Sequence, residues 1–480
     1  MTNVISIKKN LMWNSIRIGT GYIFPVISFA YVSRILGASG IGTVSYVYTI
    51  VSYFTMFALL GIPTYALREG AKFRNDIVML SKFVSEMYII IIGTTVISLG
   101  LYSFLIFNND FAEYRTLLLI MGLVIPCSSI GASWYFQIIE DYKRISLQAI
   151  LFQIISLVLI FTFIKTSADV IKYGAIHILG TVGSNVLYFV TVQKRIKLFQ
   201  SNNYNIIRHI KPILIIFGMT IASTIYLSFD SIMLGYMIGD EAVGLYAVAL
   251  KLISVVIALI ASLNGVILAR LSVYINNNNL EKFRELLSNA FNFIFMLAVP
   301  ASFGLYALSE QLVSLFSGAE YMESAEILRL LSINVILSPI NGLIAYQVFM
   351  PYGKEMYSLI ATIVGSLINF TLNLIFIPIF QQNGAAITTI IAELCVFSIC
   401  IFYASKLTNM KLYFRNLYQY ILAAMPIILI GYITSKLVNN MVLQTCIVVT
   451  LGFFTYFTLL KLQKNDFLLT VIRNVYKRKL

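Results

Sequence analysis

The stretch LGASGIG at residues 36–42 recurs as IGDEAVG at residues 238–244. Gly37 and Gly42 of the first stretch correspond to Gly239 and Gly244, which lie 202 residues later. Further along the chain, a second set of matches recurs at an offset of 210 residues. In this set, Gln137, Tyr142 and the pair Gly174 and Ala175 correspond to Gln347, Tyr352 and the pair Gly384 and Ala385. A nearly constant offset predicts an internal duplication with one short insertion between the two sets.

The composition shows in which solvent the duplicated units fold. Hydrophobic residues make up 59% of the 480 residues and charged residues only 11%, and the mean hydropathy is +0.87. Soluble globular proteins carry about 25% charged residues. Too little polar surface is therefore present to cover a soluble particle, and the chain is predicted to be an all-α polytopic membrane protein.

A membrane-spanning helix needs ~20 apolar residues to cross a hydrocarbon layer of about 30 Å. By this measure the chain contains about fourteen apolar segments of sufficient length. They begin near Leu11, Val44, Phe83, Tyr114, Leu147, Ile171, Pro212, Val243, Leu287, Ile327, Met356, Gly384, Asn416 and Met441. An even number of spans predicts that both termini lie on the same side of the membrane.

The distribution of Lys and Arg predicts which side this is. With the N-terminus inside, most of the 34 basic residues fall in cytoplasmic segments, and the acidic residues show no such bias. Because positive charge marks the cytoplasmic side, both termini are predicted to be cytoplasmic. The net charge of +14 is then interpreted as contact with anionic lipid headgroups, including those facing the basic C-terminal tail, and no nucleic acid is expected as a partner.

The repeat divides the predicted spans into lobes. Residues 1–200 are expected to form an N-terminal lobe of helices 1–6, and residues 201–410 a C-terminal lobe of helices 7–12. Residues 411–480 are expected to add helices 13 and 14 and a basic cytoplasmic tail. Because each lobe has six helices, its copy enters the membrane in the same orientation, so the two lobes form a parallel repeat. Transporters built in this way bind their substrate between the lobes.

Two motifs at the ends of the first two spans resemble a known family. These motifs are YVSRILG at residues 31–37, followed by Gly42 and Tyr46, and GIPTYALREGA at residues 61–71. They are similar to the Wzx-type polysaccharide flippases of the multidrug/oligosaccharidyl-lipid/polysaccharide (MOP) exporter superfamily. The resemblance extends over the whole chain in span count, lobe repeat and terminal helix pair.

The resemblance implies a function in the bacterial cytoplasmic (inner) membrane. A repeat unit linked to undecaprenyl pyrophosphate would move from the inner to the outer leaflet for O-antigen, other lipopolysaccharide or capsule synthesis. Alternating access would be coupled to an ion gradient, and a polysaccharide polymerase is a candidate partner. A cation-coupled drug or metabolite antiporter of the same superfamily is the alternative.

Basic residues in or beside the predicted spans are candidates for binding the pyrophosphate, because an ionisable group within a membrane is costly. Arg17 lies in the first span beside Gly19 and Gly21, and a guanidinium offers paired donors to a diphosphate. The other candidates are Arg34, Arg68 and Lys251. Arg17 could instead pair with Glu86, and Arg34 could serve as an anchor at the outer rim. The basic segment 68–82 is predicted to be a helix lying on the membrane surface.

Oxygen-bearing residues of the second lobe form a candidate ion-coupling site. Asn369 and Asn373 share one helix face, and Thr389 and Glu393 are four residues apart on the next span. Asp230, on the seventh span, is expected at a similar depth. Such oxygens suit H⁺ or Na⁺, with Na⁺ at Asp230, Asn369, Asn373 and Thr389. Alternatively, Lys251 neutralises Asp230 or Glu393 as an ion pair.

The sequence contains no G-x-x-x-x-G-K-[ST] motif, so ATP hydrolysis by this chain is not expected. It also contains no H-E-x-x-H motif and no glycine-rich dinucleotide fingerprint. A secondary transporter with no cofactor is therefore predicted rather than an enzyme.

Overall fold

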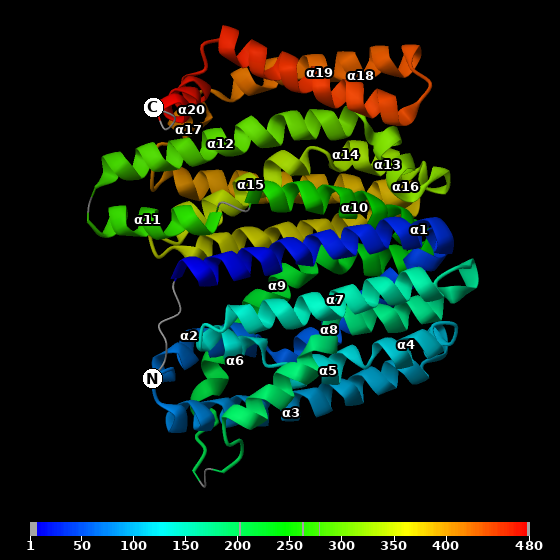
Figure 1. Cartoon of the computed structure of the whole chain (residues 1–480), viewed down its shortest axis with the longest axis vertical. Coiled ribbons are helices and arrows are strands. Elements are labelled where there is room, and N and C mark those ends of the chain that lie inside the picture. The colour runs from blue at the N-terminus through cyan, green and yellow to red at the C-terminus, as the bar shows by residue number, and fades with distance from the viewer. Residues whose placement is uncertain (1–6, 201–202, 262–263, 278, 478–480) are drawn as a thin grey trace. The chain divides into compact units, whose positions relative to one another are not determined.

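The computed structural model describes residues 7–200, 203–261, 264–277 and 279–477. Throughout these residues the regular elements are helices, as Figure 1 shows. Eleven helices of the described residues are long and apolar enough to cross a membrane, or twelve if the bent pair 324–331 and 334–349 forms one span. The prediction of an all-α, multi-pass membrane protein is therefore confirmed.

The chain separates into two compact units. The first runs to Gly235 and also includes Gly239–Gly244, and the second comprises Tyr236–Ile238 and Leu245–Leu480. The helices up to the boundary are α1 (Ile7–Leu59), α2 (Ile62–Gly70), η1 (Ala71–Phe73), α3 (Ile77–Phe107), η2 (Asn109–Phe111), α4 (Arg115–Met121), α5 (Val124–Ile130), α6 (Ser133–Ile138), α7 (Tyr142–Phe163), η3 (Ser167–Asp169), α8 (Val170–Arg195) and α9 (Ile207–Met237).

The remaining helices belong mainly to the second unit. They are α10 (Asp240–Ala261), α11 (Asn264–Asn276), α12 (Leu280–Ala307), α13 (Ser309–Ser317), η4 (Ala319–Tyr321), α14 (Ser324–Leu331), α15 (Asn334–Leu343), the π-helical η5 (Ile344–Phe349), α16 (Glu355–Ser405), α17 (Met410–Phe414), α18 (Leu417–Leu437), α19 (Met441–Leu462) and α20 (Asp466–Lys477). Within this unit, α18 packs against α19 and α12.

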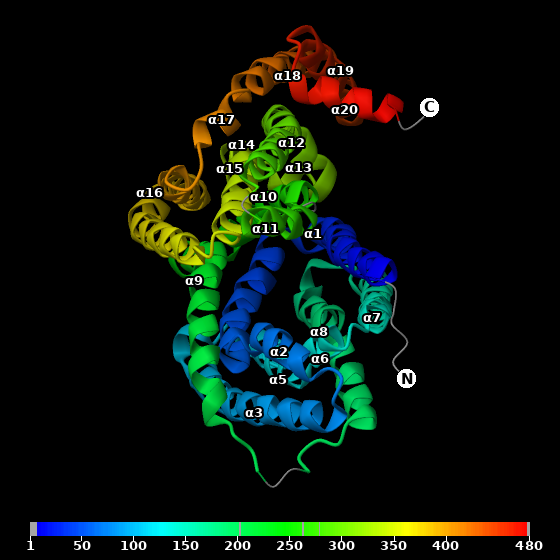
Figure 2. The ribbon, with the colours of Figure 1, turned by 90° about the vertical axis from the view of Figure 1, so that its left-hand side faces the viewer.

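Two helices are much longer than one membrane crossing requires. The 53-residue α1 is broken at Gly37, whose backbone has φ 72° and ψ 177°. The 51-residue α16 is broken at Gln381, with φ 51° and ψ −130°. Glycine adopts a positive φ without steric cost, whereas a residue with a Cβ pays about 1–2 kcal/mol. Figure 2 shows the ribbon of α1 changing direction between its two halves.

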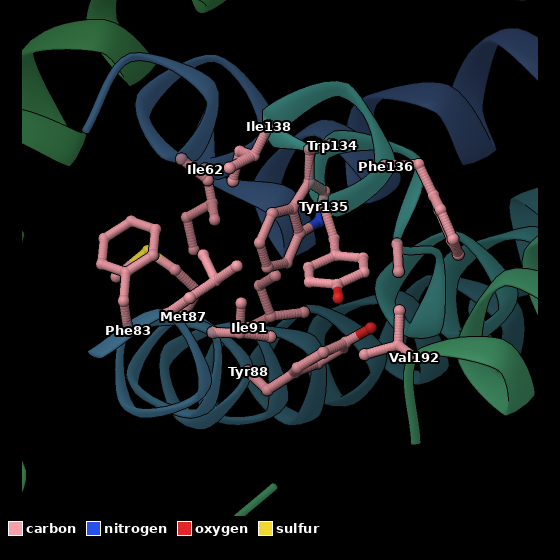
Figure 3. Close-up of a cluster of buried hydrophobic side chains, with 14 of the residues drawn as sticks. Ile62, Phe83, Met87, Tyr88, Ile91, Trp134, Tyr135, Phe136, Ile138 and Val192 are labelled. Atoms are coloured by element: carbon pink, nitrogen blue, oxygen red, sulfur yellow. The ribbon is translucent and has the colours of Figure 1, made fainter. Parts of the chain in front are cut away.

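Side chains from six helices, α2, α3, α6, α7, α8 and α9, form a core in the first unit. Ile62 of α2, Tyr88 of α3, Trp134 of α6 and Val192 of α8 are buried in it (Figure 3). The Tyr88 hydroxyl donates to the Ile130 carbonyl at 3.1 Å, so its polar atom is satisfied inside the cluster. Because lipid is as apolar as these side chains, close packing and such hydrogen bonds hold the helices together.

Many large apolar side chains point away from the two units. Phe104 and Phe107 at the end of α3 are 82% and 75% exposed, and Leu462 at the end of α19 is 72% exposed. Exposed apolar surface on this scale is costly in water and is typical of helices surrounded by lipid.

The prediction of a surface helix over residues 68–82 is wrong. Arg68 lies in the last turn of α2, which continues into the short helix η1, and α3 begins at Ile77. The Asp76 carboxylate accepts hydrogen bonds from the backbone N–H groups of Val78 and Met79. This N-cap starts α3 in the middle of the segment because it satisfies donors that a continuous helix would use internally.

Candidate functional site

The repeated glycines Gly42 and Gly244 lie against each other's backbone in the first unit. A Cβ atom on Gly42 would stand 1.6 Å from the Asp240 carbonyl oxygen, and one on Gly244 would stand 1.9 Å from the Ala38 carbonyl oxygen. Real Cβ atoms do not come closer than 3.0 Å to such atoms. The duplicated motif therefore marks a backbone crossing at which only glycine fits.

The Asp240 side chain reinforces this crossing. Its carboxylate accepts hydrogen bonds from Thr43 Oγ1 and from Tyr114 Oη, the latter at 2.9 Å. Burial, the hydrogen bond to Asp240 and the charge of that carboxylate raise the pKa of the Tyr114 hydroxyl, which stays protonated as a donor. Sequence reasoning missed this role of Asp240, although the residue lies inside the repeated motif.

Arg17 lies on α1 beside several buried polar atoms. Its Nη2 donates to Asn14 Oδ1 at 2.9 Å, whereas its Nε is buried and has no hydrogen-bond partner in the described part of the chain. The same holds for Trp13 Nε1 on α1 and for the side-chain oxygens of Gln148 and Gln153 on α7. Since α1 and α7 pack along each other, this helix pair carries buried donors on α1 and buried acceptors on α7, which are the group types that bind hydroxyls and phosphates.

A cavity continues this polar region within the first unit. Its volume is about 250 Å³, and α1, α7 and α8 supply its lining, which includes Pro25, Gln153, Tyr173 and His177. His177 stacks edge-on against Tyr48, with ring centroids 4.8 Å apart. The cavity therefore combines aromatic rings with amide and imidazole groups.

The other predicted phosphate-binding residues occupy different places. Arg34 is exposed on α1 shortly before the Gly37 break. Arg68 is exposed in the last turn of α2, with its guanidinium carbon 5.9 Å from the centre of the Tyr65 ring. Lys251 is half-buried on α10 in the second unit. The structure thus brings none of Arg17, Arg34 and Arg68 into the lining of the cavity that contains His177.

The interpretation that Arg17 pairs with Glu86 is wrong. Glu86, fully buried on α3, accepts hydrogen bonds from Arg208 Nη2 at 2.8 Å and from the Asn205 backbone N–H at 2.9 Å. The His209 Nε2 atom lies 3.0 Å from the same carboxylate. Glu86 therefore holds the start of α9 against α3, and Arg17 keeps its own partner, Asn14. Sequence spacing could not reveal this, because Arg208 is more than a hundred positions from Glu86.

We expect Glu86→Gln to destabilise the protein by about 2–4 kcal/mol, because an amide has one accepting oxygen where the buried carboxylate uses both, for Arg208 and for the Asn205 backbone N–H. The loss of stability is limited because Arg208 is 47% exposed and its guanidinium can be solvated by water once the ion pair is lost. Thermal unfolding of the purified protein in detergent measures the effect. Glu69→Gln is the matched control, since the Glu69–Lys72 ion pair is exposed and its loss should cost less than about 1 kcal/mol. Equal losses in both variants would contradict the assigned role of Glu86.

Polar side chains of α15 and α16 cluster in the second unit. Asn373 Nδ2 donates to Asn369 Oδ1 at 3.2 Å, and Thr388 Oγ1 donates to Asn373 Oδ1. Asn341 Nδ2 donates to Glu393 Oε2 at 2.6 Å. The predicted neighbours Asn369 and Asn373 therefore do meet, across one turn of α16, and they are nearly fully buried.

Sequence reasoning predicted Thr389 but missed three residues of these contacts, Tyr246, Thr388 and Asn341. Thr389 is 3.2 Å from the Tyr246 hydroxyl, and its neighbour Thr388 is the residue that contacts Asn373. Asn341 was missed as well, although an amide between Pro339 and Gly342 in an apolar run is a detectable signal. The α15–α16 oxygens can hold a small cation or a proton only after some of these hydrogen bonds rearrange.

Asp230 lies in the first unit, on α9. It is 5% exposed and follows Phe229, whose ring contacts Tyr53 of α1 with centroids 6.3 Å apart. The Tyr53 hydroxyl donates to the Thr224 carbonyl at 3.3 Å. A role for Asp230 in ion coupling together with residues of the second unit remains a prediction.

Two solved structures place this fold in a class of membrane transporters. The lipid II flippase MurJ, in an inward closed conformation, is 17% identical and matches with a TM-score of 0.74 over 95% of this chain and 99% of its own. An inward-facing multidrug resistance MATE family transporter of the MOP superfamily is also 17% identical, with a TM-score of 0.60 over 85% of this chain and 99% of its own. The chain therefore shares the fold of these two proteins.

Two family models match long parts of the chain. Residues 7–275 match the polysaccharide biosynthesis protein family, and residues 212–375 match the MatE family. Since the first match covers more than half of the residues, the chain belongs to the polysaccharide biosynthesis protein family. The resemblance to polysaccharide flippases of the MOP superfamily is thereby confirmed.

Two relatives bear names that describe glycan transport. A protein of Escherichia coli (strain K12), provisionally named an O-antigen transporter, is 23% identical over 412 residues, which are 84% of this chain and 97% of the relative. A Haloferax volcanii protein, provisionally named a low-salt glycan biosynthesis flippase, is 22% identical over 242 residues, 50% of this chain and 51% of its own.

Proposed function

We propose that this protein flips undecaprenyl-pyrophosphate-linked oligosaccharide repeat units from the inner to the outer leaflet of the bacterial cytoplasmic membrane. The observation that carries the proposal is the set of buried polar atoms on α1 and α7 that have no hydrogen-bond partner in the described part of the chain, with Arg17 Nε among them. A pyrophosphate needs a cationic donor, and sugars need amide and indole groups for their hydroxyls. Membership of the polysaccharide biosynthesis protein family supports the same substrate class.

The proposed topology has fourteen crossings with both termini in the cytoplasm. Counting α1 and α16 as two crossings each, on either side of Gly37 and Gln381, and the bent pair in residues 324–349 as one, raises the eleven long helices to fourteen. The lobes at residues 1–200 and 201–410 and the terminal pair at 411–480 follow from this topology. The excess of Lys and Arg in the inner segments supports the orientation.

The experiment that tests this function is deletion of the gene in its host. Lipid-linked oligosaccharide and surface polysaccharide, O-antigen or capsule, are then followed together. Accumulated lipid-linked repeat units with a bare surface support the flippase. Normal surface glycan, in a strain with no other transporter for it, overturns the proposal.

A cation-coupled antiporter of small molecules is the second candidate, favoured by the match of residues 212–375 to the MatE family. It predicts that the deletion changes tolerance to drugs and leaves surface glycan unaltered. The same deletion strain therefore distinguishes the two candidates.

Coupling to H⁺ or Na⁺ is part of the proposal, with Asp230 as the first residue to test. We expect Asp230→Asn to reduce gradient-driven export about fivefold or more, because a neutral amide neither carries a proton nor balances a cation. Export is compared with and without a protonophore, and in Na⁺ or K⁺ medium.

Two further variants make the coupling test decisive. Glu310→Gln removes an exposed acid paired with Arg329 and should leave export within about twofold of normal. Rescue of Asp230→Asn by Lys251→Met would instead favour an ion pair between the two residues and count against a coupling site at Asp230.

A further inference from the structure

A second cavity in the first unit lies between the start of α3 and the end of α8. Its volume is about 530 Å³, and it is lined by residues 77–85 of α3 and by residues 195–200. The wall formed by the latter segment is attached to α3: the Phe199 backbone N–H donates to Ser85 Oγ at 3.0 Å, and Ser85 Oγ donates to the Ser81 carbonyl at 2.8 Å. These two hydrogen bonds therefore fix the wall of the cavity against α3.

The charged groups lining this cavity are all basic. Lys82, Arg195 and Lys197 line it, and none of the described residues that line it carries a carboxylate. Arg195 is partly neutralised by Asp141, 3.2 Å from its Nη2. In the part of the chain that the structure describes, no acid lies within ion-pair distance of Lys82 or Lys197. The cavity therefore carries a net positive charge, because only Arg195 of its three basic residues has an acidic partner among the described residues.

Apolar side chains form one edge of the same cavity. Ile77, Val78 and Met79 line it and are 56%, 73% and 53% exposed. Three consecutive exposed apolar residues beside a basic cluster fit an amphipathic ligand with an anionic head and a hydrocarbon tail. An inorganic anion would use the basic residues and leave the apolar edge in contact with water, which is unfavourable.

We propose that this cavity binds the headgroup of an anionic phospholipid. Lys82, Lys197 and Arg195 hold the phosphodiester, and the acyl chains run over Ile77, Val78 and Met79. Basic pockets between membrane helices are known to take such headgroups through charge and hydrogen bonding. The proposal is independent of the transported substrate, because none of these residues belongs to the α1–α7 region that contains Arg17.

Native mass spectrometry of the full-length protein in detergent tests the proposal. The protein is titrated with phosphatidylglycerol and with phosphatidylcholine of identical acyl chains. We expect the doubly substituted Lys82→Gln, Lys197→Gln protein to bind phosphatidylglycerol about tenfold more weakly than the unaltered protein. Binding of phosphatidylcholine, whose headgroup has no net charge, should change less than about twofold.

The matched control removes the same charge elsewhere. Lys143 and Lys461 are exposed and lie outside the cavity, so the Lys143→Gln, Lys461→Gln protein should retain phosphatidylglycerol binding. An equal loss in both proteins would mean general surface attraction and overturn the site. Complete displacement of the lipid by millimolar inorganic phosphate would identify a free-phosphate site and overturn the lipid assignment. Unfolding temperatures of both proteins establish that each is folded.

Discussion

Gly42→Ala is expected to destabilise the first unit by about 3 kcal/mol or more, at or beyond the upper end of the usual cost of overpacking. The new methyl group would lie 1.6 Å from the Asp240 carbonyl oxygen. A flexible side chain could rotate away from such a clash, but a backbone carbonyl moves only if the helix that carries it moves. Loss of folded protein on size-exclusion chromatography, or a sharply lower unfolding temperature in detergent, measures the effect.

The reciprocal contact supplies an internal check of this prediction. Gly244→Ala should have a comparable effect, because its Cβ would meet the Ala38 carbonyl oxygen at 1.9 Å. Gly93→Ala on α3 is the matched control: no atom lies within 4 Å of its added Cβ, so a change between zero and about 1 kcal/mol of stabilisation is expected. Normal stability of Gly42→Ala would show that the two segments do not cross so closely.

Arg17→Ala is expected to lower export of the lipid-linked repeat unit by more than about tenfold while protein levels stay near normal. Among the described residues the guanidinium makes one hydrogen bond, to Asn14 one turn away, so its loss removes little that holds the fold together. In the proposed function, however, it removes the paired donors for a pyrophosphate, and each tenfold loss corresponds to about 1.4 kcal/mol of binding. Surface polysaccharide and accumulated lipid-linked intermediate are the two readouts.

Two variants separate a phosphate contact from a general effect of charge. Arg17→Lys keeps the charge but loses the planar fork, so it should restore export only in part. Arg34→Ala, at an exposed position on the same helix, should reduce export less than Arg17→Ala does. Unchanged export in Arg17→Ala would remove this residue from the proposed substrate site.

Much of the helical architecture could be predicted because it depends on local composition. Apolar runs of sufficient length have few alternatives in a membrane, where backbone groups must be satisfied within each helix. The repeated glycines Gly37 and Gly239 have φ values of 72° and 125°. Because glycine adopts a positive φ without steric cost, these values explain why glycine stands at both positions. The family was likewise detectable from short motifs near residues 31–37 and 61–71.

The sequence by itself determined that this is a helical membrane protein with a repeated glycine motif and charges buried within its apolar helices. Only the tertiary structure decided which groups these charges meet: Glu86 with Arg208 rather than Arg17, Glu393 with Asn341, and Asp240 with Tyr114. The physical reason is that the length of an apolar run indicates which segments enter the membrane. The partner of a buried charge depends on the rotation and neighbours of each helix, which are set by close packing across the whole fold.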